Sequence, residues 1–270
     1  MLRMVPLPRF AGADEKGKLL LEVSLMRRWT SPVIDAAAIF LIVMAAKTAI
    51  AEPYYVPSGS MEPTLQIGDE LLATKYPYGY SAASLPSFIN LPDTQRVLGA
   101  LPQRGDIVVF RWPGDRSEIW VKRVVGLPGD RIAMRNGRLS INGAAVALKA
   151  DGIDQAEADD GSYQPIGRFI ETLPGNRSHP IFKHAGIGPF DNMAEILVPP
   201  DHLFVMGDNR DNSADSRIAV DAGGVGLLPV SDLVGRVEAL VGSWDLAVRR
   251  QPLWRWPAGL RLSRFFTSVQ

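Results

Sequence analysis

The sequence predicts a mainly β protein, made of antiparallel sheets and preceded by one transmembrane helix. Three observations lead to this fold class. Gly and Pro occur 25 and 21 times in 270 residues and divide the chain into short segments. Runs of β-branched residues lie between these breaks, and two Asn-Gly pairs mark tight hairpins. One nearly continuous apolar stretch, residues 33–50, has the length of a membrane helix.

The composition limits the classes of function that the chain can have. Its formal net charge is zero, which argues against a general nucleic-acid binder, because such proteins carry an excess of basic residues. Cysteine is absent, which excludes disulfides, thiolate metal sites and a cysteine nucleophile. No set of spaced ligands indicates a metal site, so we expect neither a metal nor another cofactor.

Residues 33–50 are the expected anchor, and residues 1–32 are the expected cytoplasmic segment before it. In a helix, residues 33–50 extend roughly 27 Å, close to the hydrocarbon thickness of a bilayer. Basic residues are concentrated in 1–32, whereas residues 51–74 contain no Lys or Arg. The positive-inside rule therefore places the N-terminus in the cytoplasm and residues 51–270 across the membrane. A buried core helix is the alternative interpretation of the stretch.

Residues 56–65 are predicted to form a shaped loop directly after the anchor. Two prolines, which cannot donate backbone hydrogen bonds, flank a Ser-Gly-Ser segment whose glycine allows unusual backbone angles. Such a loop can hold the hydroxyl of Ser58 or Ser60 in one direction. Taken alone, the loop is better interpreted as an ordinary turn, because Pro, Ser and Gly are the commonest turn residues.

The next elements are predicted from β-branched runs and from turn residues. Residues 69–75, 107–110 and 118–125 each match the pattern of a strand. The Asn-Gly pairs at 136–137 and 142–143 are strong hairpin signals, because Asn and Gly accept the left-handed backbone of a type I′ turn.

Lys122 is the candidate general base. On a strand over residues 118–125, Trp120, Lys122 and Val124 share one face, so the amine has apolar neighbours. Burial among such groups lowers the pKa of a lysine, because it penalises the charged form. The other lysines of this region, Lys75, Lys149 and Lys183, are expected in polar or loop contexts. The alternative for Lys122 is a strand-edge lysine that faces water.

Residues 147–195 are interpreted as an insertion between strands, which makes up most of a second β subdomain. Its first part carries five acidic side chains between residues 151 and 160 and is expected to be a solvated loop. His179 and His184 also lie in this segment, and neither is placed in a catalytic arrangement.

Residues 207–217 form a dense polar block that follows the apolar run 203–206. Such a block after a buried run indicates an organised site, although an elaborate turn is the simpler alternative. A calcium loop is disfavoured, because the glycine and terminal glutamate of an EF-hand are missing. The C-terminal tail, residues 244–270, interleaves Arg with Trp and Phe. This composition is typical of contact with anionic lipid headgroups, and the alternative is that its aromatic residues complete the β core.

Four segments resemble, in order, the motifs of bacterial type I signal peptidases. They are residues 57–65 (Pro-Ser-Gly-Ser-Met-x-Pro-Thr-Leu), 104–108 (Arg-Gly-Asp-Ile-Val), 122–130 (Lys-Arg-Val-Val-Gly-x-Pro-Gly-Asp) and 207–217 (Gly-Asp-Asn-Arg-x-Asn-Ser-x-Asp-Ser-Arg). Residues 256–264 also resemble the C-terminus of Gram-negative members. The match covers most of the chain after the anchor, apart from the insertion. It departs in having one apparent anchor where some members have two, and Trp120 where Tyr is common.

The resemblance implies a Ser/Lys endopeptidase that removes signal peptides from exported preproteins after small residues of the Ala-x-Ala type. It implies Ser60 as the nucleophile and Lys122 as the general base. The Ser60 backbone N–H and the Ser58 hydroxyl are the implied oxyanion donors, and Ser213 is implied to orient the Lys122 amine by a hydrogen bond. The remaining implied roles are a bracing salt-bridge network of Asp208, Asp215 and Arg217, and substrate pockets lined by Val56 and Val121.

The resemblance also implies a location and partners. The catalytic domain, residues 51–270, is expected on the extracytoplasmic side of the bacterial inner membrane, with preproteins and the lipid bilayer as partners and no nucleic acid. Two alternatives stay open. One is a relative with a narrower task, such as processing pilins or serving a conjugation system. The other is a catalytically silent, membrane-tethered β module that binds exported segments.

Overall fold

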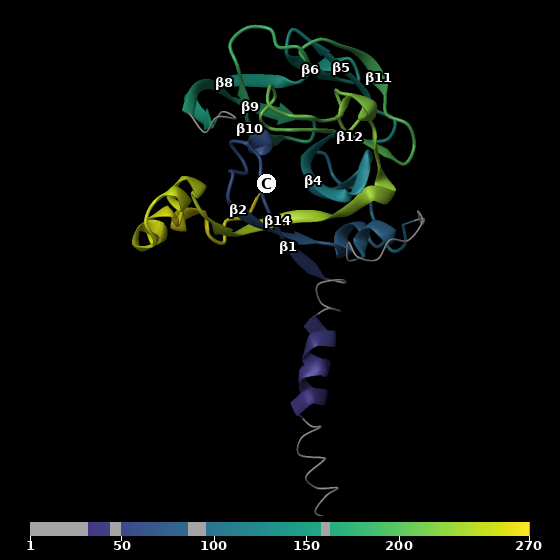
Figure 1. Cartoon of the computed structure of the whole chain (residues 1–270). Coiled ribbons are helices and arrows are strands. Elements are labelled where there is room, and N and C mark those ends of the chain that lie inside the picture. The colour runs from purple at the N-terminus through teal and green to yellow at the C-terminus, as the bar shows by residue number, and fades with distance from the viewer. Residues whose placement is uncertain (1–31, 44–49, 86–95, 158–162, 270) are drawn as a thin grey trace, which may run out of the picture. The chain divides into compact units, whose positions relative to one another are not determined.

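The computed structural model describes residues 32–43, 50–85, 96–157 and 163–269 (Figure 1). The chain divides into two compact units, residues 1–47 and 48–270. In the first unit, residues 32–43 are helical and exposed. Within the described ranges, no helix is both long enough and apolar enough to cross a membrane. Residues 44–49 of the expected anchor lie outside the described residues.

The second unit is built of antiparallel sheets, which confirms the mainly β prediction. Its largest described sheet has seven strands in the order β1-β2-β14-β3-β4-β12-β13. These strands are β1 (Ala51–Tyr55), β2 (Asp69–Thr74), β3 (Ile107–Trp112), β4 (Asp115–Gly126), β12 (His202–Met206), β13 (Leu228–Pro229) and β14 (Leu233–Ser243). Strands β2, β3 and β4 fall where the sequence predicted strands.

Two smaller sheets complete the described β structure. One has the strand order β11-β5-β6-β7 and the other β10-β9-β8. Their strands are β5 (Arg131–Arg135), β6 (Arg138–Ile141), β7 (Ala144–Ala145), β8 (Ala147–Glu157), β9 (Tyr163–Leu173), β10 (Arg177–Lys183) and β11 (Met193–Leu197). Short 3-10 helices connect the strands and form the tail: η1 (Gly59–Met61), η2 (Tyr76–Tyr78), η3 (Ala82–Ser84), η4 (Val220–Ala222), η5 (Val230–Asp232), η6 (Leu246–Arg250), η7 (Leu253–Gly259) and η8 (Leu262–Arg264).

Both predicted hairpins are confirmed. The β5–β6 connection is Asn136-Gly137, with φ angles of 49° and 74°. The β6–β7 connection is Asn142-Gly143, with φ angles of 53° and 79°. Two successive positive φ angles define a type I′ turn, the turn whose twist matches that of the flanking strands.

The prediction of a solvated loop in the insertion is wrong for the described residues of its acidic part. Asp151 and Asp154 lie in strand β8, and the Arg168 side chain of β9 forms ion pairs with both, at 2.9 and 3.2 Å. Cross-strand pairing with an opposite charge removes the repulsion that favoured a loop. Asp151 and Asp154 are therefore part of a sheet, whose partner strand the sequence pattern did not reveal.

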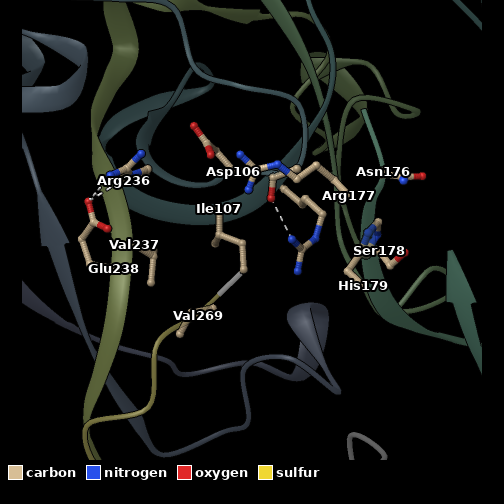
Figure 2. A pocket seen from close by; sticks show the side chains of 12 residues that line it. Asp106, Ile107, Asn176, Arg177, Ser178, His179, Arg236, Val237, Glu238 and Val269 are labelled. Atoms are coloured by element: carbon tan, nitrogen blue, oxygen red, sulfur yellow. Dashed lines mark hydrogen bonds and ion pairs between the residues drawn. The ribbon is translucent and has the colours of Figure 1, made fainter. Parts of the chain in front are cut away.

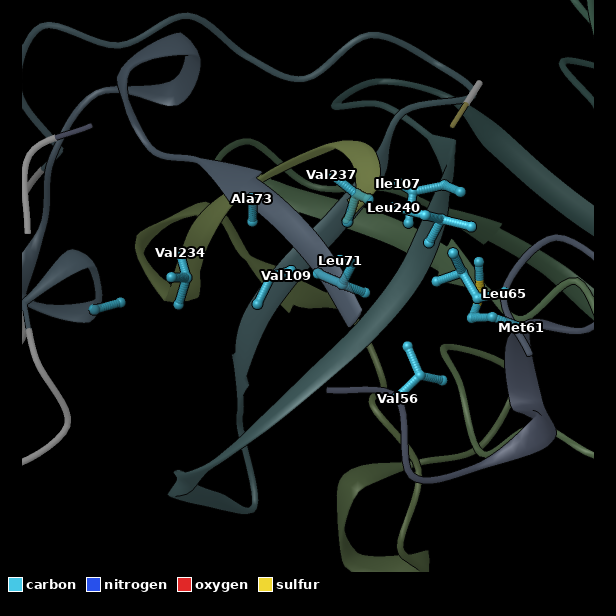
Figure 3. Packing of buried hydrophobic residues seen from close by; sticks show 11 residues of the cluster. Val56, Met61, Leu65, Leu71, Ala73, Ile107, Val109, Val234, Val237 and Leu240 are labelled. Atoms are coloured by element: carbon cyan, nitrogen blue, oxygen red, sulfur yellow. The ribbon is translucent and has the colours of Figure 1, made fainter. Parts of the chain in front are cut away.

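A cluster of buried hydrophobic residues fixes the loop that carries Ser58 and Ser60. Val56, Met61 and Leu65 pack together with side chains of β2, β3 and β14 (Figure 3). Met61 and Leu65 are both 0% exposed, and full burial of such a side chain contributes about 1.5–3 kcal/mol. Because these residues lie on both sides of Ser60, their burial anchors the backbone before and after the serine.

Candidate active site

Ser60 lies in the middle of η1, on a loop that the polar block holds from the other side. The Asn209 backbone N–H donates to the Ser60 carbonyl oxygen at 3.1 Å. The Asn209 side-chain amide donates to the Gly59 carbonyl oxygen at 3.2 Å. The turn predicted from Pro, Ser and Gly is thus tied to residues 207–217, about 150 positions later in the chain.

Lys122 lies on β4, and its amine contacts the Ser60 hydroxyl. Lys122 Nζ is 2.9 Å from Ser60 Oγ and 3.0 Å from the Val121 carbonyl oxygen. Its side chain is 4% exposed, and Nζ lies 5.5 Å from the centroid of the Trp120 ring. The predicted apolar face of β4 is therefore confirmed on the Trp120 side, and an amine at hydrogen-bond distance from a hydroxyl can accept that hydroxyl's proton when the amine is neutral.

The surroundings of Lys122 lower its pKa to about 8. Burial is the largest cause, because it penalises the ammonium form. The carboxylates of Asp215 and Asp208 act in the opposite direction, and the Arg217 guanidinium adds to the lowering. A lysine with this pKa is neutral in a substantial fraction of molecules near pH 8, so it can accept a proton.

Lys75 and Lys183 have polar contacts, as predicted, but both side chains are also buried, which was not expected. Lys75 pairs with Glu52 at 3.0 Å and donates to the Ser84 carbonyl oxygen. Lys183 pairs with Asp191 at 2.6 Å. Burial alone does not distinguish Lys122 from them. The difference lies in the contact partners, since a carboxylate holds each of these two ammonium groups, whereas the described contacts of Lys122 Nζ are a hydroxyl, a carbonyl and an aromatic ring.

Ser58 and the two valines also lie at this site. Ser58 Oγ is 3.5 Å from Ser60 Oγ, so the two hydroxyls are neighbours on an exposed edge of the loop. Val56 belongs to the buried cluster below the loop, and the partly buried Val121 packs against the same cluster. The structure thus brings Ser58, Val56 and Val121 together around Ser60 and Lys122.

Ser213 does not make the expected hydrogen bond to Lys122. Its side chain is buried, and Ser213 Oγ has no hydrogen-bond partner among the described residues. It packs against Gly207 so tightly that a Cβ added there would lie 2.2 Å from Ser213 Oγ and 2.5 Å from the Ser60 carbonyl oxygen. The Ser213 hydroxyl is therefore next to the Ser60 backbone, but it is not bonded to Lys122.

Asp208, Asp215 and Arg217 were expected to form one salt-bridge network. In the structure, Asp215 pairs with Arg217, whereas Asp208 pairs with a different arginine, Arg123. Asp215 accepts two hydrogen bonds from the Arg217 side chain, at 2.9 and 2.8 Å. Asp208 accepts two from Arg123, both at 2.8 Å. Arg123 was missed as a site residue. Strand alternation places Arg123 on the opposite face of β4 from Lys122, so the strand pattern gave no signal for its pairing with Asp208, 85 positions later in the chain.

Three further residues of this charged region were also missed, two of them within the supposed insertion. Glu171 of β9 binds the Arg210 guanidinium with both oxygens, one of them at 2.7 Å. His179 of β10 lies 3.5 Å from a Glu171 oxygen and 3.9 Å from an Asp208 oxygen. Burial, and next the Arg123 charge, lower the pKa of His179 to about 4. No sequence spacing links these residues, because the β9–β10 register brings them together.

A cavity of about 420 Å³ borders the buried charges on one side. Arg123 and His179 line it together with Arg177 and Arg236 (Figure 2). Neither Ser60 nor Lys122 is part of its lining. Within the described part of the chain, no group of three or more His, Asp or Glu side chains is arranged to hold a metal ion.

The chain is similar to known signal peptidases. A family model described as signal peptidase, peptidase S26, matches residues 27–244. Signal peptidase I of Rickettsia typhi is 34% identical over 250 residues, which cover 86% of this chain and 90% of that protein. Signal peptidase I of Pseudomonas aeruginosa is 36% identical over 213 residues, covering 76% and 70%.

One solved structure is also similar, a signal peptidase I from Enterococcus faecalis V583. It is 25% identical, covers 51% of this chain and 97% of its own, and has a TM-score of 0.29. The family and relative matches confirm the resemblance that the four sequence motifs indicate.

Proposed function

Because the chain belongs to the signal peptidase family, peptidase S26, and is thus a serine endopeptidase, we propose that it removes signal peptides from exported preproteins. We propose further that it does so with a Ser60/Lys122 dyad. The observation that carries this proposal is the 2.9 Å contact between Lys122 Nζ and Ser60 Oγ. A serine hydroxyl is a poor nucleophile until a base removes its proton. A buried lysine at hydrogen-bond distance can be that base.

The reaction proceeds through an acyl-enzyme. Neutral Lys122 accepts the Ser60 proton as Oγ attacks the scissile carbonyl carbon, and the charge develops on the carbonyl oxygen. The Ser60 backbone N–H and the Ser58 hydroxyl stabilise that oxyanion. Protonated Lys122 then donates its proton to the leaving amine, which departs as the new N-terminus. A water molecule, deprotonated by Lys122, then attacks the ester carbon. The bond to Ser60 Oγ breaks as Lys122 returns the proton to Oγ, and the signal peptide is released.

The charged pairs and Ser213 have supporting roles. Asp208 and Asp215 are carboxylates that raise the pKa of Lys122 while burial lowers it. Their pairing with Arg123 and Arg217 keeps these carboxylates fixed in the buried region. Ser213 helps to hold the loop of Ser60, since its buried side chain packs against Gly207 next to the Ser60 carbonyl oxygen.

The expected specificity is for small residues on the acyl side of the cleaved bond, as in Ala-x-Ala. Val56 and Val121, which pack in one cluster beside the nucleophile, are the proposed pocket lining. Valines that belong to a packed core cannot move aside, so a large substrate side chain would have to displace core atoms.

We place the reaction at the extracytoplasmic surface of the bacterial inner membrane. Residues 33–50 are the proposed anchor, because of their apolar run and the basic segment before them. The tail is the proposed second contact with lipid. In it, Leu253, Trp254, Leu262 and Phe266 are 70–81% exposed, and Arg255 lies among them in sequence. Exposed aromatic and basic side chains together favour the interfacial region of a bilayer.

The decisive test is cleavage of a model preprotein with an Ala-x-Ala junction, with the N-terminus of the product sequenced. Wild type should release the mature protein, and Ser60→Ala and Lys122→Ala should not. Lys149→Ala is the matched control, because Lys149 is an exposed lysine on β8. Full activity of Lys122→Ala would rule out the dyad.

A further inference from the structure

Glu171 and Arg210 form a buried ion pair that joins the β8–β10 sheet to the polar block. Glu171 and Arg210 are each 2% exposed. The carboxylate faces the guanidinium with both oxygens, a bidentate arrangement that fixes distance and direction. A buried charge pair of this kind is costly to desolvate, so its presence requires an explanation beyond general stability.

Arg210 is directly attached to the residue that holds the nucleophile's loop. Asn209, its neighbour, donates to the backbone oxygens of Ser60 and Gly59. Arg210 Nε donates to the Gly207 carbonyl oxygen at 3.2 Å. A displacement of the Arg210 side chain therefore displaces Gly207 and Asn209, and through them Ser60.

The backbone of β10 supports the same segment. The Phe182 N–H donates to the Asp208 carbonyl oxygen at 2.9 Å, and the Arg210 N–H donates to the Phe182 carbonyl oxygen at 2.9 Å. These two backbone hydrogen bonds attach the polar block to the sheet, and the ion pair between Glu171 and Arg210 adds a side-chain contact. The sheet of the expected insertion is thus in direct contact with the polar block that binds the loop of Ser60.

We propose that Glu171 is a positioning residue for the cleavage reaction. It acts through Arg210 and Asn209 to hold the Ser60 hydroxyl at hydrogen-bond distance from the Lys122 amine. This inference rests on the proposed function. Glu171 makes no described contact with Ser60 or Lys122, so it acts by geometry and charge. Its carboxylate neutralises Arg210, which otherwise adds a positive charge to the region where Asp208, Asp215 and Arg217 surround Lys122.

The test is Glu171→Gln in the full-length chain, assayed on the model preprotein. Loss of the charge should lower kcat by about 10²-fold, the typical cost of a small misplacement of reacting groups, and should leave KM nearly unchanged. The uncompensated Arg210 charge disfavours protonated Lys122. The acidic limb of the pH–rate profile should therefore move to lower pH. A merely structural role would change the amount of active enzyme but not that limb.

Two variants complete the design. Glu171→Asp keeps the charge, so the acidic limb of its pH–rate profile should match that of wild type, and its kcat should decrease less than that of Glu171→Gln. If Glu171→Gln does not fold, the decrease in kcat of Glu171→Asp provides the test. Glu195→Gln is the matched control, because Glu195 forms an exposed pair with Arg131 at 2.9 Å, and it should behave as wild type. Wild-type kcat in the Glu171 variants, or a loss that tracks only the folded fraction, overturns the inference. Absence of cleavage by wild type itself overturns the proposed function, and this inference with it.

Discussion

Asn209 donates hydrogen bonds from both its backbone and its side chain to the loop that carries Ser60. Its N–H binds the Ser60 carbonyl oxygen at 3.1 Å, and its amide binds the Gly59 carbonyl oxygen at 3.2 Å. One residue thus satisfies two backbone acceptors on a segment whose prolines cannot donate. The orientation of Ser60, the proposed nucleophile, therefore depends on the polar block as well as on its own turn.

Gly207→Ala should strongly slow cleavage, because the polar block contacts the loop of Ser60 at Gly207. A Cβ there would lie 2.2 Å from Ser213 Oγ and 2.5 Å from the Ser60 carbonyl oxygen, so the Ser60 backbone has to shift. A misplacement near 1 Å typically costs about 10²-fold in rate. Cleavage rates of the purified variant measure the effect. Gly242→Ala is the control, since its Cβ meets the flexible end of Glu70 at 3.2 Å. Normal activity of Gly207→Ala would contradict the contact.

The rate of cleavage should rise with pH as Lys122 loses its proton. The base must be neutral, and its pKa is lowered to about 8. Well below that pH, kcat/KM should fall about tenfold for each pH unit, since only the neutral fraction reacts. Lys122→Arg should be inactive at every pH, because a guanidinium is not deprotonated in proteins. The measurement is kcat/KM from pH 5 to pH 10 on an uncharged peptide substrate. Undiminished activity at pH 5 would rule out a neutral lysine as base.

Local pattern was sufficient to predict the strands that carry the proposed dyad. The β-branched runs gave β3 and β4, period-2 alternation placed Lys122 beside Trp120, and Asn-Gly chemistry gave both hairpins. In each case the structure is decided by residues close together in the chain.

The buried charges around Asp208 could not be predicted in the same way. Glu171, His179 and Arg210 meet because β9 and β10 pair in a particular register and dock on the polar block. Charged residues in a segment without apolar periodicity predict a solvated loop. These side chains can be buried only because the fold brings an oppositely charged or hydrogen-bonding partner to each of them. For the same reason, the sequence did not show that Lys75 and Lys183 are buried against carboxylates.

Asp208→Asn should destabilise the protein strongly. Arg123 is 1% exposed, and the Asp208 carboxylate neutralises it. Removing one partner of a buried pair typically costs about 3–5 kcal/mol, because the remaining charge stays desolvated. Urea unfolding, followed by circular dichroism, measures the loss. Asp245→Asn, at a pair with Arg261 whose N–O separation is 3.8 Å and which is partly exposed, should change the free energy of unfolding by less than about 1 kcal/mol. Equal effects of the two substitutions would contradict this account.

Trp254→Ser should reduce cleavage of membrane-embedded substrate while leaving cleavage of a soluble peptide unchanged. Trp254 is 80% exposed on η7, so its removal disturbs no core packing, but the proposed interfacial contact of its ring would be lost. The ratio of the two rates, with preprotein in anionic vesicles and peptide in detergent, isolates the lipid effect. Val97→Ser is the control, because Val97 is 57% exposed and lies outside the tail. An unchanged ratio for Trp254→Ser would argue against contact between the tail and lipid.

Acid should destabilise the fold through His179. Its pKa is lowered from 6.5 to about 4 by burial and by the Arg123 charge, so the folded state holds the ring neutral. Between about pH 6.5 and pH 4, the unfolded state binds a proton that the folded state does not. The stabilisation is therefore fully present above pH 6.5 and decreases as the pH falls toward 4, by an amount on the order of 3 kcal/mol. His179→Leu, which cannot be protonated, should flatten the dependence of the free energy of unfolding on pH in that window. A slope that survives in His179→Leu would assign the acid sensitivity to the carboxylates instead.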